Sequence, residues 1–238
     1  MRRNLFSVVS LGLALLFVDA AYAELLEAVD DNCIRGGLDQ AGTVQHCWGD
    51  LPVKKSVNIE FARKAYVKFD LNGHNPDGSQ PATFTIRKAD LPAADFTVNV
   101  YGLLAGFIPD AGELGTDWSK TLLTWNNAPA NIDTITGFDS TEASWIGTIA
   151  PQQSDAIGTC YSVDFPTLNT YLQSDNTVTI FLIVDSQSQS APSMVFASSG
   201  HADIVGPELH FVPEPATLTL LLFLPVAWAV YSRRRKTG

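Results

Sequence analysis

The stretch Arg63-Lys64-Ala65-Tyr66-Val67-Lys68-Phe69-Asp70-Leu71 alternates between two sets of side chains. One set is apolar (Ala65, Val67, Phe69, Leu71), and the other is mostly polar (Lys64, Tyr66, Lys68, Asp70). A period of two residues is typical of a β-strand, because successive side chains point to opposite faces. We therefore expect a strand with one buried face and one solvent face, on which Lys64, Tyr66 and Lys68 point outward.

Similar short runs follow along the chain and are separated by clusters rich in Gly, Pro, Asn and Asp. The other strand candidates are 53–59, 84–86, 96–100, 122–125, 145–149, 160–165, 177–184, 194–197 and 208–212. Only 166–172 could form a helical turn or two. About ten short strands without intervening helices indicate an all-β antiparallel sandwich rather than βαβ units. No internal linker is visible, so we expect one domain over residues 24–212.

The N-terminus has the three parts of a secretory signal peptide. Arg2 and Arg3 precede an apolar run of 14 residues, 5–18, and Ala21-Tyr22-Ala23 provides an A-x-A cleavage site. We expect signal peptidase to remove residues 1–23 and to leave Glu24 as the first residue of the exported protein. An uncleaved membrane anchor is the alternative.

The C-terminus ends in an apolar segment and a basic cluster. Residues 216–231 are 16 residues long, or about 24 Å as a helix, slightly short of a bilayer core of about 30 Å. The basic cluster that follows is a stop-transfer signal, which predicts a short transmembrane segment with a cytoplasmic tail. The cluster consists of Arg233, Arg234, Arg235 and Lys236.

These features resemble the PEP-CTERM sorting signal of Gram-negative bacteria over residues 213–238. Pro213-Glu214-Pro215, the short apolar segment and the terminal arginines occur in the order of that signal. The resemblance implies transient residence in the inner membrane, recognition by an exosortase, and processing near the Pro-Glu-Pro motif. It also implies a cell-surface or extracellular protein of a host that makes exopolysaccharide or biofilm matrix. The alternative is an ordinary C-terminal membrane anchor.

The charge of the chain is concentrated in its central body. The whole chain of 238 residues has a net charge of −10, whereas residues 24–212 contain nine basic and 23 acidic residues, a net charge of −14. This acidity argues against nucleic-acid binding, which requires a basic face. Seven of the nine basic residues lie within 54–88, and none lies within 121–212. Chance clustering on solvated strands and a basic patch for an acidic partner both remain open.

The three cysteines permit one disulfide. In an oxidising compartment a Cys33–Cys47 bridge is plausible and would close a 15-residue loop, a stabilisation of about 3 kcal/mol in the chain-entropy description. Cys160 would then be a buried free thiol, although pairing with Cys160 instead also remains open. The spacings do not suggest a zinc site.

The body also resembles a known family through motifs that occur in one order. These are Ile34-Arg35-Gly36-Gly37, 63–71, Thr97-Val98-Asn99-Val100-Tyr101-Gly102, Leu123-Thr124-Trp125-Asn126-Asn127-Ala128-Pro129, Phe196-Ala197-Ser198 and Pro207-Glu208-Leu209. The sequence resembles the DNRLRE-type domain, also described as carbohydrate-binding module family 96. The resemblance implies a jelly-roll-type β-sandwich in an exported protein that binds polysaccharide. The chain departs from the family at Gly200-His201, where members often have an acidic residue.

Candidate sugar-binding residues follow from side-chain chemistry. Aromatic faces stack on pyranose rings, and cations attract uronates. Trp48 and Trp118, both in loops, are candidates, and the alternative is that each anchors its loop. The row Lys64, Tyr66 and Lys68 is the other candidate, and the alternative is a solvated face whose lysines protect the sheet edge. We expect Trp125 in the core and do not place Trp145. No cofactor is expected; a structural Ca²⁺ near Asp30 and Asp31 is the one metal considered.

The chain contains no recognisable catalytic motif. There is no G-x-S-x-G elbow, H-E-x-x-H pair or phosphate-binding glycine loop, and the four histidines are scattered. We therefore expect a non-enzymatic exported protein that binds or organises polysaccharide. A structural or adhesive matrix protein that binds proteins or itself is the alternative, and a polysaccharide lyase or hydrolase is the least favoured.

Overall fold

The computed structural model describes residues 24–47, 49–74, 79–91, 94–135, 137–186 and 193–211. The strands are β1 (Glu24–Glu27), β2 (Asp30–Arg35), β3 (Asp50–Val53), β4 (Arg63–Asp70), β5 (Ala82–Arg87), β6 (Thr97–Leu103), β7 (Ala143–Ile149), β8 (Cys160–Phe165), β9 (Thr177–Ser186), β10 (Met194–Ala197) and β11 (Glu208–Phe211). Two short 3-10 helices accompany them, η2 (Ile59–Phe61) and η3 (Leu168–Thr170).

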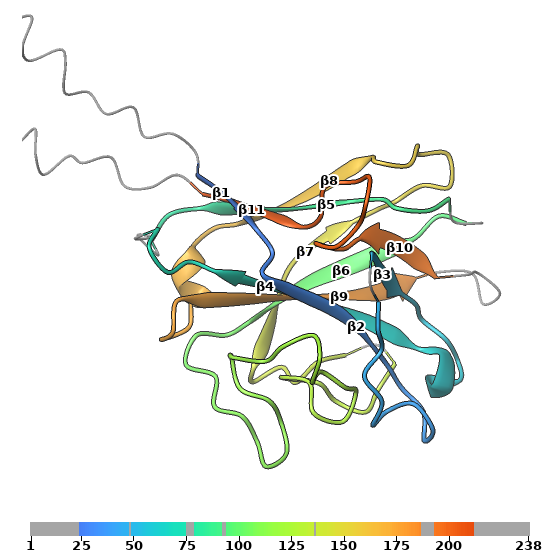
Figure 1. Ribbon diagram of the computed structural model, residues 1–238, viewed down its shortest axis with the longest axis horizontal. Helices are drawn as coiled ribbons and strands as arrows, with labels where there is room; N and C mark the ends of the chain where they lie inside the picture. The colour runs from blue at the N-terminus through green and yellow to red at the C-terminus, as the bar shows by residue number, and fades with distance from the viewer. Residues whose placement is uncertain are drawn as a thin grey trace, which may run out of the picture.

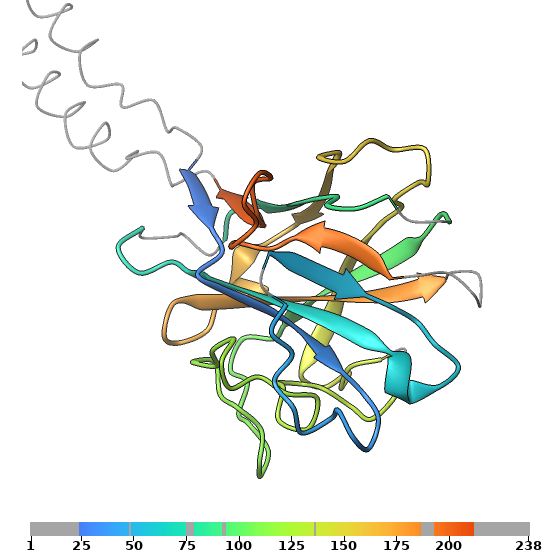
Figure 2. The same ribbon diagram turned by 45° about the vertical axis from the view of Figure 1, so that its right-hand side comes forward.

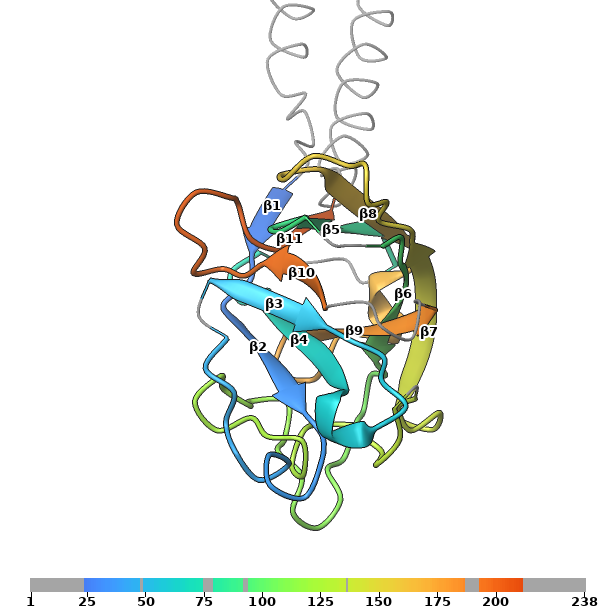
Figure 3. The ribbon, with the colours of Figure 1, turned by 90° about the vertical axis from the view of Figure 1, so that its right-hand side faces the viewer.

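The strands form antiparallel sheets that face one another (Figure 1). One sheet has the order β1-β11-β5-β8 and the other β2-β4-β9-β6-β7, while β10 and β3 form a two-stranded ribbon beside them. In the end view of Figure 3, the ribbon lies on one side of the sandwich, and β7 and β8 lie close together on the other. The predicted all-β antiparallel sandwich is confirmed, and the jelly-roll assignment stays a prediction.

The main core lies between the two large sheets. The apolar side chains of the stretch 63–71 are buried, as the sequence predicts. Ala65, Val67, Phe69 and Leu71 are at most 1% exposed. These side chains pack with residues from the opposite sheet, such as Phe84 and Leu209, and with Phe196 of the ribbon. The period-two alternation of β4 thus identifies one of its buried faces correctly.

A second core covers the other face of the five-stranded sheet. The long segment 104–142 between β6 and β7 has little regular structure and folds back under β4 and β9 (Figures 1 and 2). It contributes Trp118, Leu123, Trp125 and Phe138 to a cluster with Tyr66 and Phe181 of the sheet. This cluster adds a third layer to the sandwich, so β4 and β9 in the middle of the five-stranded sheet are buried on both faces.

The predicted outward row of β4 is therefore wrong. Lys64 and Tyr66 are 0% exposed and Lys68 is 8% exposed, because segment 104–142 covers them. The Lys64 ammonium donates to Asn131 Oδ1 (2.7 Å), to the Ile132 carbonyl (3.2 Å) and to the Gly137 carbonyl (2.6 Å). The row serves to hold a loop layer rather than to contact a ligand.

The other two members of the row bind the same segment. Tyr66 donates its hydroxyl proton to the Pro129 carbonyl (3.1 Å), and the Lys68 ammonium donates to the Trp118 carbonyl. Lys68 also forms a salt bridge of 3.6 Å with Asp30 on β2. Carbonyl groups of an irregular segment need donors when they are buried, and long lysine and tyrosine side chains can provide them.

Burial changes the acidity of Lys64. Desolvation lowers the pKa of its ammonium to about 7, and the negative charge of Asp133 opposes this effect. The rings of Trp125 and Phe138 lie 4.6 Å and 4.7 Å from Nζ and favour the charged form through cation–π attraction. Three acceptors and two rings thus surround an amine whose charge is costly to bury.

The Thr-Trp-Asn-Asn motif explains how segment 104–142 keeps its shape. The predicted strand 122–125 is wrong, because Asn127 closes a turn there by accepting from the Thr124 amide (2.7 Å) and donating to the Leu122 carbonyl (3.0 Å). Trp125 is buried, as the sequence predicts, and its indole donates to Asp133 (3.1 Å). This motif thus has a structural role.

Other predictions of secondary structure have mixed outcomes. The predicted helical turn within 166–172 is confirmed by η3. The predicted strand over 53–59 is wrong, because β3 ends at Val53 and η2 begins at Ile59. β1 and β2 are not among the predicted strands, because their short runs lack a clear alternation of apolar and polar residues. None of the helices in the described ranges is long and apolar enough to cross a membrane, and the predicted span 216–231 lies outside those ranges.

The cysteines are divided between a bridge and a free thiol. Cys33 on β2 is joined to Cys47 by a disulfide with a Cα–Cα distance of 5.9 Å. The bridge ties the loop after β2 to the edge of the five-stranded sheet. Cys160 is free, as expected for the third cysteine, but it is exposed at the start of β8 rather than buried.

The substitution Lys64→Met tests whether the row holds the loop layer. It keeps the length of the side chain but leaves three partly buried acceptors without this donor, so the free energy of unfolding should fall by about 2–4 kcal/mol. Urea unfolding followed by fluorescence measures this change. Lys120→Met, at an exposed position of the same segment, is the control. Equal stability of both variants would show that the ammonium contributes little.

Candidate functional site

Most of the sequence-predicted contact residues are not on the surface. Trp118 is 1% exposed and donates its indole proton to Thr179 Oγ1 (3.1 Å), so it anchors a loop, as do the buried side chains of Lys64, Tyr66 and Lys68. Trp48 lies outside the described residues. The same holds for Ala21 and Ala23 of the cleavage site and for the sorting residues Pro213, Glu214, Pro215, Arg233, Arg234 and Arg235. Glu24 is the first residue of β1.

A different group of cations lies side by side at the β2 edge of the five-stranded sheet. Arg35 on β2 pairs with Arg63 on β4, and Arg63 forms a further antiparallel bridge with Lys54 just beyond β3. Cα partners in such pairs are about 4.5–5.5 Å apart, with their side chains on the same face. We call Arg35, Arg63 and Lys54 the basic ladder. All three residues are partly exposed, and none forms a salt bridge within the described ranges.

The surroundings of the basic ladder orient its guanidinium groups. Arg35 lies over the ring of Phe61 at 5.5 Å and donates from Nε to the Glu60 carbonyl (2.7 Å), while Arg63 donates to Ser193 Oγ (2.9 Å). The Glu60 carboxylate accepts from Asn58 instead (3.3 Å). Burial and the positive charge of Arg35 lower the pKa of Arg63, a sign that the two cations share one environment.

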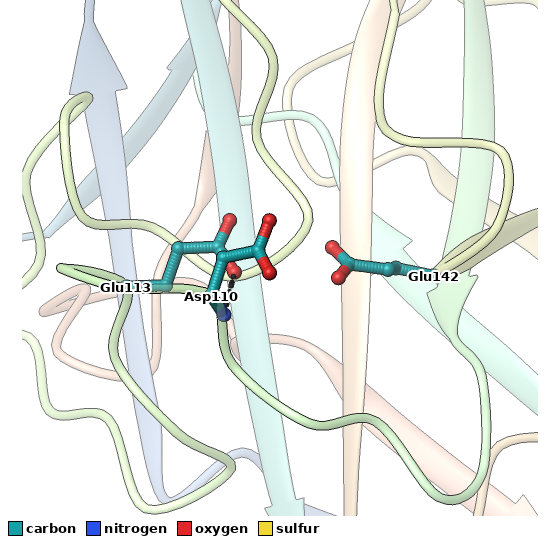
Figure 4. Close-up of side chains that lie close together, drawn as sticks. All are labelled: Asp110, Glu113 and Glu142. Carbon is teal, nitrogen blue, oxygen red and sulfur yellow. Dashed lines mark hydrogen bonds between the residues drawn. The ribbon is translucent and has the colours of Figure 1, made fainter.

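The described residues also contain a group of three carboxylates in the loop layer. Asp110, Glu113 and Glu142 each have an oxygen within 4.8 Å of the other two. Figure 4 shows Asp110 and Glu113 on one side and Glu142 facing them from the start of β7, with the Asp110 amide donating to Glu113 (3.0 Å). Oxygen ligands at this spacing could surround one divalent cation such as Ca²⁺.

The pKa of Glu142 reflects its surroundings. Desolvation raises its pKa to about 7, and the charges of Glu113, Asp139 and Asp110 contribute to the shift. The sequence instead suggested Asp30 and Asp31 for Ca²⁺. These carboxylates are occupied by protein partners, because Asp30 binds Lys68 and Asp31 accepts from the Ser199 amide (2.5 Å).

Sequence reasoning missed both groups because each is assembled across the fold. The partners of the basic ladder come from three segments, and only strand pairing places them in one row. Asp110 and Glu142 are 32 positions apart along the chain and meet because the loop layer returns to the sheet. The one available signal was the excess of cations between 54 and 88, which includes two members of the ladder.

The substitution Glu142→Gln tests the carboxylate group through pH. The raised pKa means that folded protein binds a proton more tightly than unfolded protein, so stability falls as pH rises from about 4.5 to about 7. Glutamine has no charge to desolvate or repel, so the melting temperature of the variant should exceed that of the wild type at pH 8 and match it near pH 4, below the pKa of the unfolded state. Asp117→Asn, at an exposed carboxylate of the same segment, is the control. A pH-independent difference would contradict the assignment.

A comparison with known protein families identifies the family of this chain. The sequence profile described as carbohydrate-binding module family 96 matches residues 26–148, slightly more than half of the chain, and no curated protein matches it. The matched range includes the second half of β1, all of β2 to β6, most of β7, the loop layer and the basic ladder. Membership of this family indicates carbohydrate binding, and modules of this kind typically have no catalytic activity. The chain therefore belongs to carbohydrate-binding module family 96.

Proposed function

We propose that this protein is a non-catalytic, exported polysaccharide-binding protein whose basic ladder contacts acidic sugars such as uronates. The observation that carries the proposal is the adjacency of Arg35, Arg63 and Lys54 without carboxylate partners on an otherwise acidic body. Guanidinium groups bind carboxylates through paired, charge-assisted hydrogen bonds, which suits a uronate ring.

The distribution of the other cations strengthens the proposal. Lys64, Lys68 and Lys88 are buried, and Lys88 donates to the carbonyls of Gln152 and Asp155 at 2.8 Å and 2.6 Å. Arg87 forms a 2.8 Å salt bridge with Glu208. A net charge of −14 over residues 24–212 would repel a polyanion, so an acidic ligand needs a local positive region.

Phe61 adds an apolar element to the same surface. Phe61 is 45% exposed, although its ring lies against the Arg35 guanidinium. A sugar combines polar groups with patches of C–H, so a ring beside two guanidinium groups fits its mixed surface.

The proposal includes the cellular route that the ends of the chain indicate. Signal peptidase would remove residues 1–23, and an exosortase would process the PEP-CTERM-like tail 213–238 after transient residence in the inner membrane. The protein would then act in the exopolysaccharide or biofilm matrix at the cell surface. The sequence patterns of the two ends support this route, and membership of a carbohydrate-binding family fits an extracellular location.

The double substitution Arg35→Gln/Arg63→Gln tests the proposed contact. Binding to soluble alginate, a polyuronate, should weaken at least about tenfold, because two charge-assisted hydrogen-bonding groups are lost. Affinity electrophoresis in alginate gels, supported by calorimetry, measures the effect. Binding by the wild type should also weaken as salt rises from low to physiological concentration, because the contact is electrostatic.

Lys120→Gln is the matched control, since it removes one exposed cation outside the basic ladder. Equal retardation of the wild type and the double variant would refute the proposed surface. Self-association without alginate binding would favour an adhesive matrix protein, and release of new reducing ends from alginate would favour an enzyme.

The proposed cleavage at both ends of the chain can be tested separately. Full-length protein produced in a Gram-negative host with an exosortase should be recovered outside the inner membrane, beginning at Glu24 and shortened near Pro213. Intact mass and N-terminal sequencing check both ends. Changing Pro213-Glu214-Pro215 to three alanines should leave the C-terminal tail attached, and unchanged processing would contradict the sorting assignment.

A further inference from the structure

Trp145 differs from the other described tryptophans in its exposure. Its side chain lies on β7, an edge strand of the five-stranded sheet, and the residue is 58% exposed, against 1% for Trp118 and 3% for Trp125. An exposed indole offers a flat apolar face on which a ligand can stack. The residues around Trp145 indicate which kind of ligand fits.

A β-bulge gives the surface its composition. Val100 pairs with Gly147, but Tyr101 pairs with Trp145, so Ile146 is an extra residue on β7. The bulge places Trp145 on the same face as Thr148, although an undistorted strand would put residues three positions apart on opposite faces. Ile146 packs against the main core and fixes this arrangement.

Polar and aromatic neighbours complete the surface. Thr148 pairs with Asn99 on β6 and donates its hydroxyl proton to Asn99 Oδ1 (2.8 Å). This bond orients the Asn99 amide, whose Nδ2 makes no hydrogen bond within the described ranges. Tyr101, the direct partner of Trp145, packs on Phe138 at 5.4 Å and connects the surface to the second core.

Charge limits the sugars that this surface can accept. β6 and β7 contain no basic residue, and none occurs anywhere within 121–212. Asp139 and Glu142 instead precede β7 closely. Acidic sugars would therefore meet repulsion here, whereas an uncharged pyranose can stack on the indole and accept a hydrogen bond from the amide.

We propose that Trp145, Asn99 and Thr148 form a second carbohydrate-binding surface, specific for uncharged polysaccharide. It lies on β7, whereas the basic ladder begins on β2, so the two surfaces occupy opposite edges of one sheet. This inference goes beyond the proposed binding of acidic sugars, since the two surfaces use different residues and different ligands. Together they would let one molecule hold two kinds of polymer.

Affinity electrophoresis in gels that contain hydroxyethylcellulose, galactomannan or mixed-linkage β-glucan tests this surface. At least one of these neutral polymers should retard the full chain. Trp145→Ala should weaken that binding at least about tenfold, as expected for loss of a central aromatic anchor. Asn99→Ala should weaken it by a smaller factor, since it removes one polar contact.

Leu122→Ala is the matched control, because Leu122 is also 58% exposed but lies in the loop layer. Leu122→Ala should bind the neutral polymers as the wild type does, and Trp145→Ala should bind alginate as the wild type does. Melting curves check that each variant is folded. Absence of retardation by all three neutral polymers, or equal retardation of the wild type and Trp145→Ala, would overturn the proposal. Neither result would affect the test of the basic ladder with alginate.

Discussion

The fold depends on hydrogen bonds from one face of β4 to the carbonyl groups of segment 104–142. Lys64, Tyr66 and Lys68 provide these bonds from consecutive positions on that face of the strand. Without such donors, an irregular segment of this length could not cover the sheet, because its peptide groups would be buried without partners. The second core, with its tryptophans, and the placement of Glu142 near Asp110 both follow from this attachment.

Burying lysines to hold a loop also changes the surface of the protein. Three of its nine body cations are inside the fold, so few positive side chains remain on the surface of an acidic body. The basic ladder is consequently a local exception on an acidic surface. At the opposite edge of the sheet, the β7 bulge produces a surface without cations, where an exposed indole lies next to an amide and a hydroxyl group.

The fold class and one core face could be predicted from the sequence, whereas the candidate sites could not. Alternation in β4 reports that Ala65 and Lys64 point to opposite faces, but not whether a distant segment covers the lysine. Polar residues normally indicate solvent, and Lys64 breaks that rule because its ammonium satisfies three acceptors. Cross-strand neighbours such as Arg35 and Arg63 depend on register, and the bulge that turns Trp145 outward leaves no signal in hydropathy.

The buried lysines have a practical consequence for chemical modification of the protein. Among the lysines of the described ranges, Lys54 and Lys55 are partly exposed and Lys120 is exposed, whereas Lys64, Lys68 and Lys88 are buried. Amine-reactive dyes and coupling to a sensor chip would therefore concentrate on a few positions. Because Lys54 belongs to the basic ladder, such labelling would orient the molecule and cover part of that surface. Attachment through the exposed thiol of Cys160 on β8 would instead leave the ladder amines unmodified.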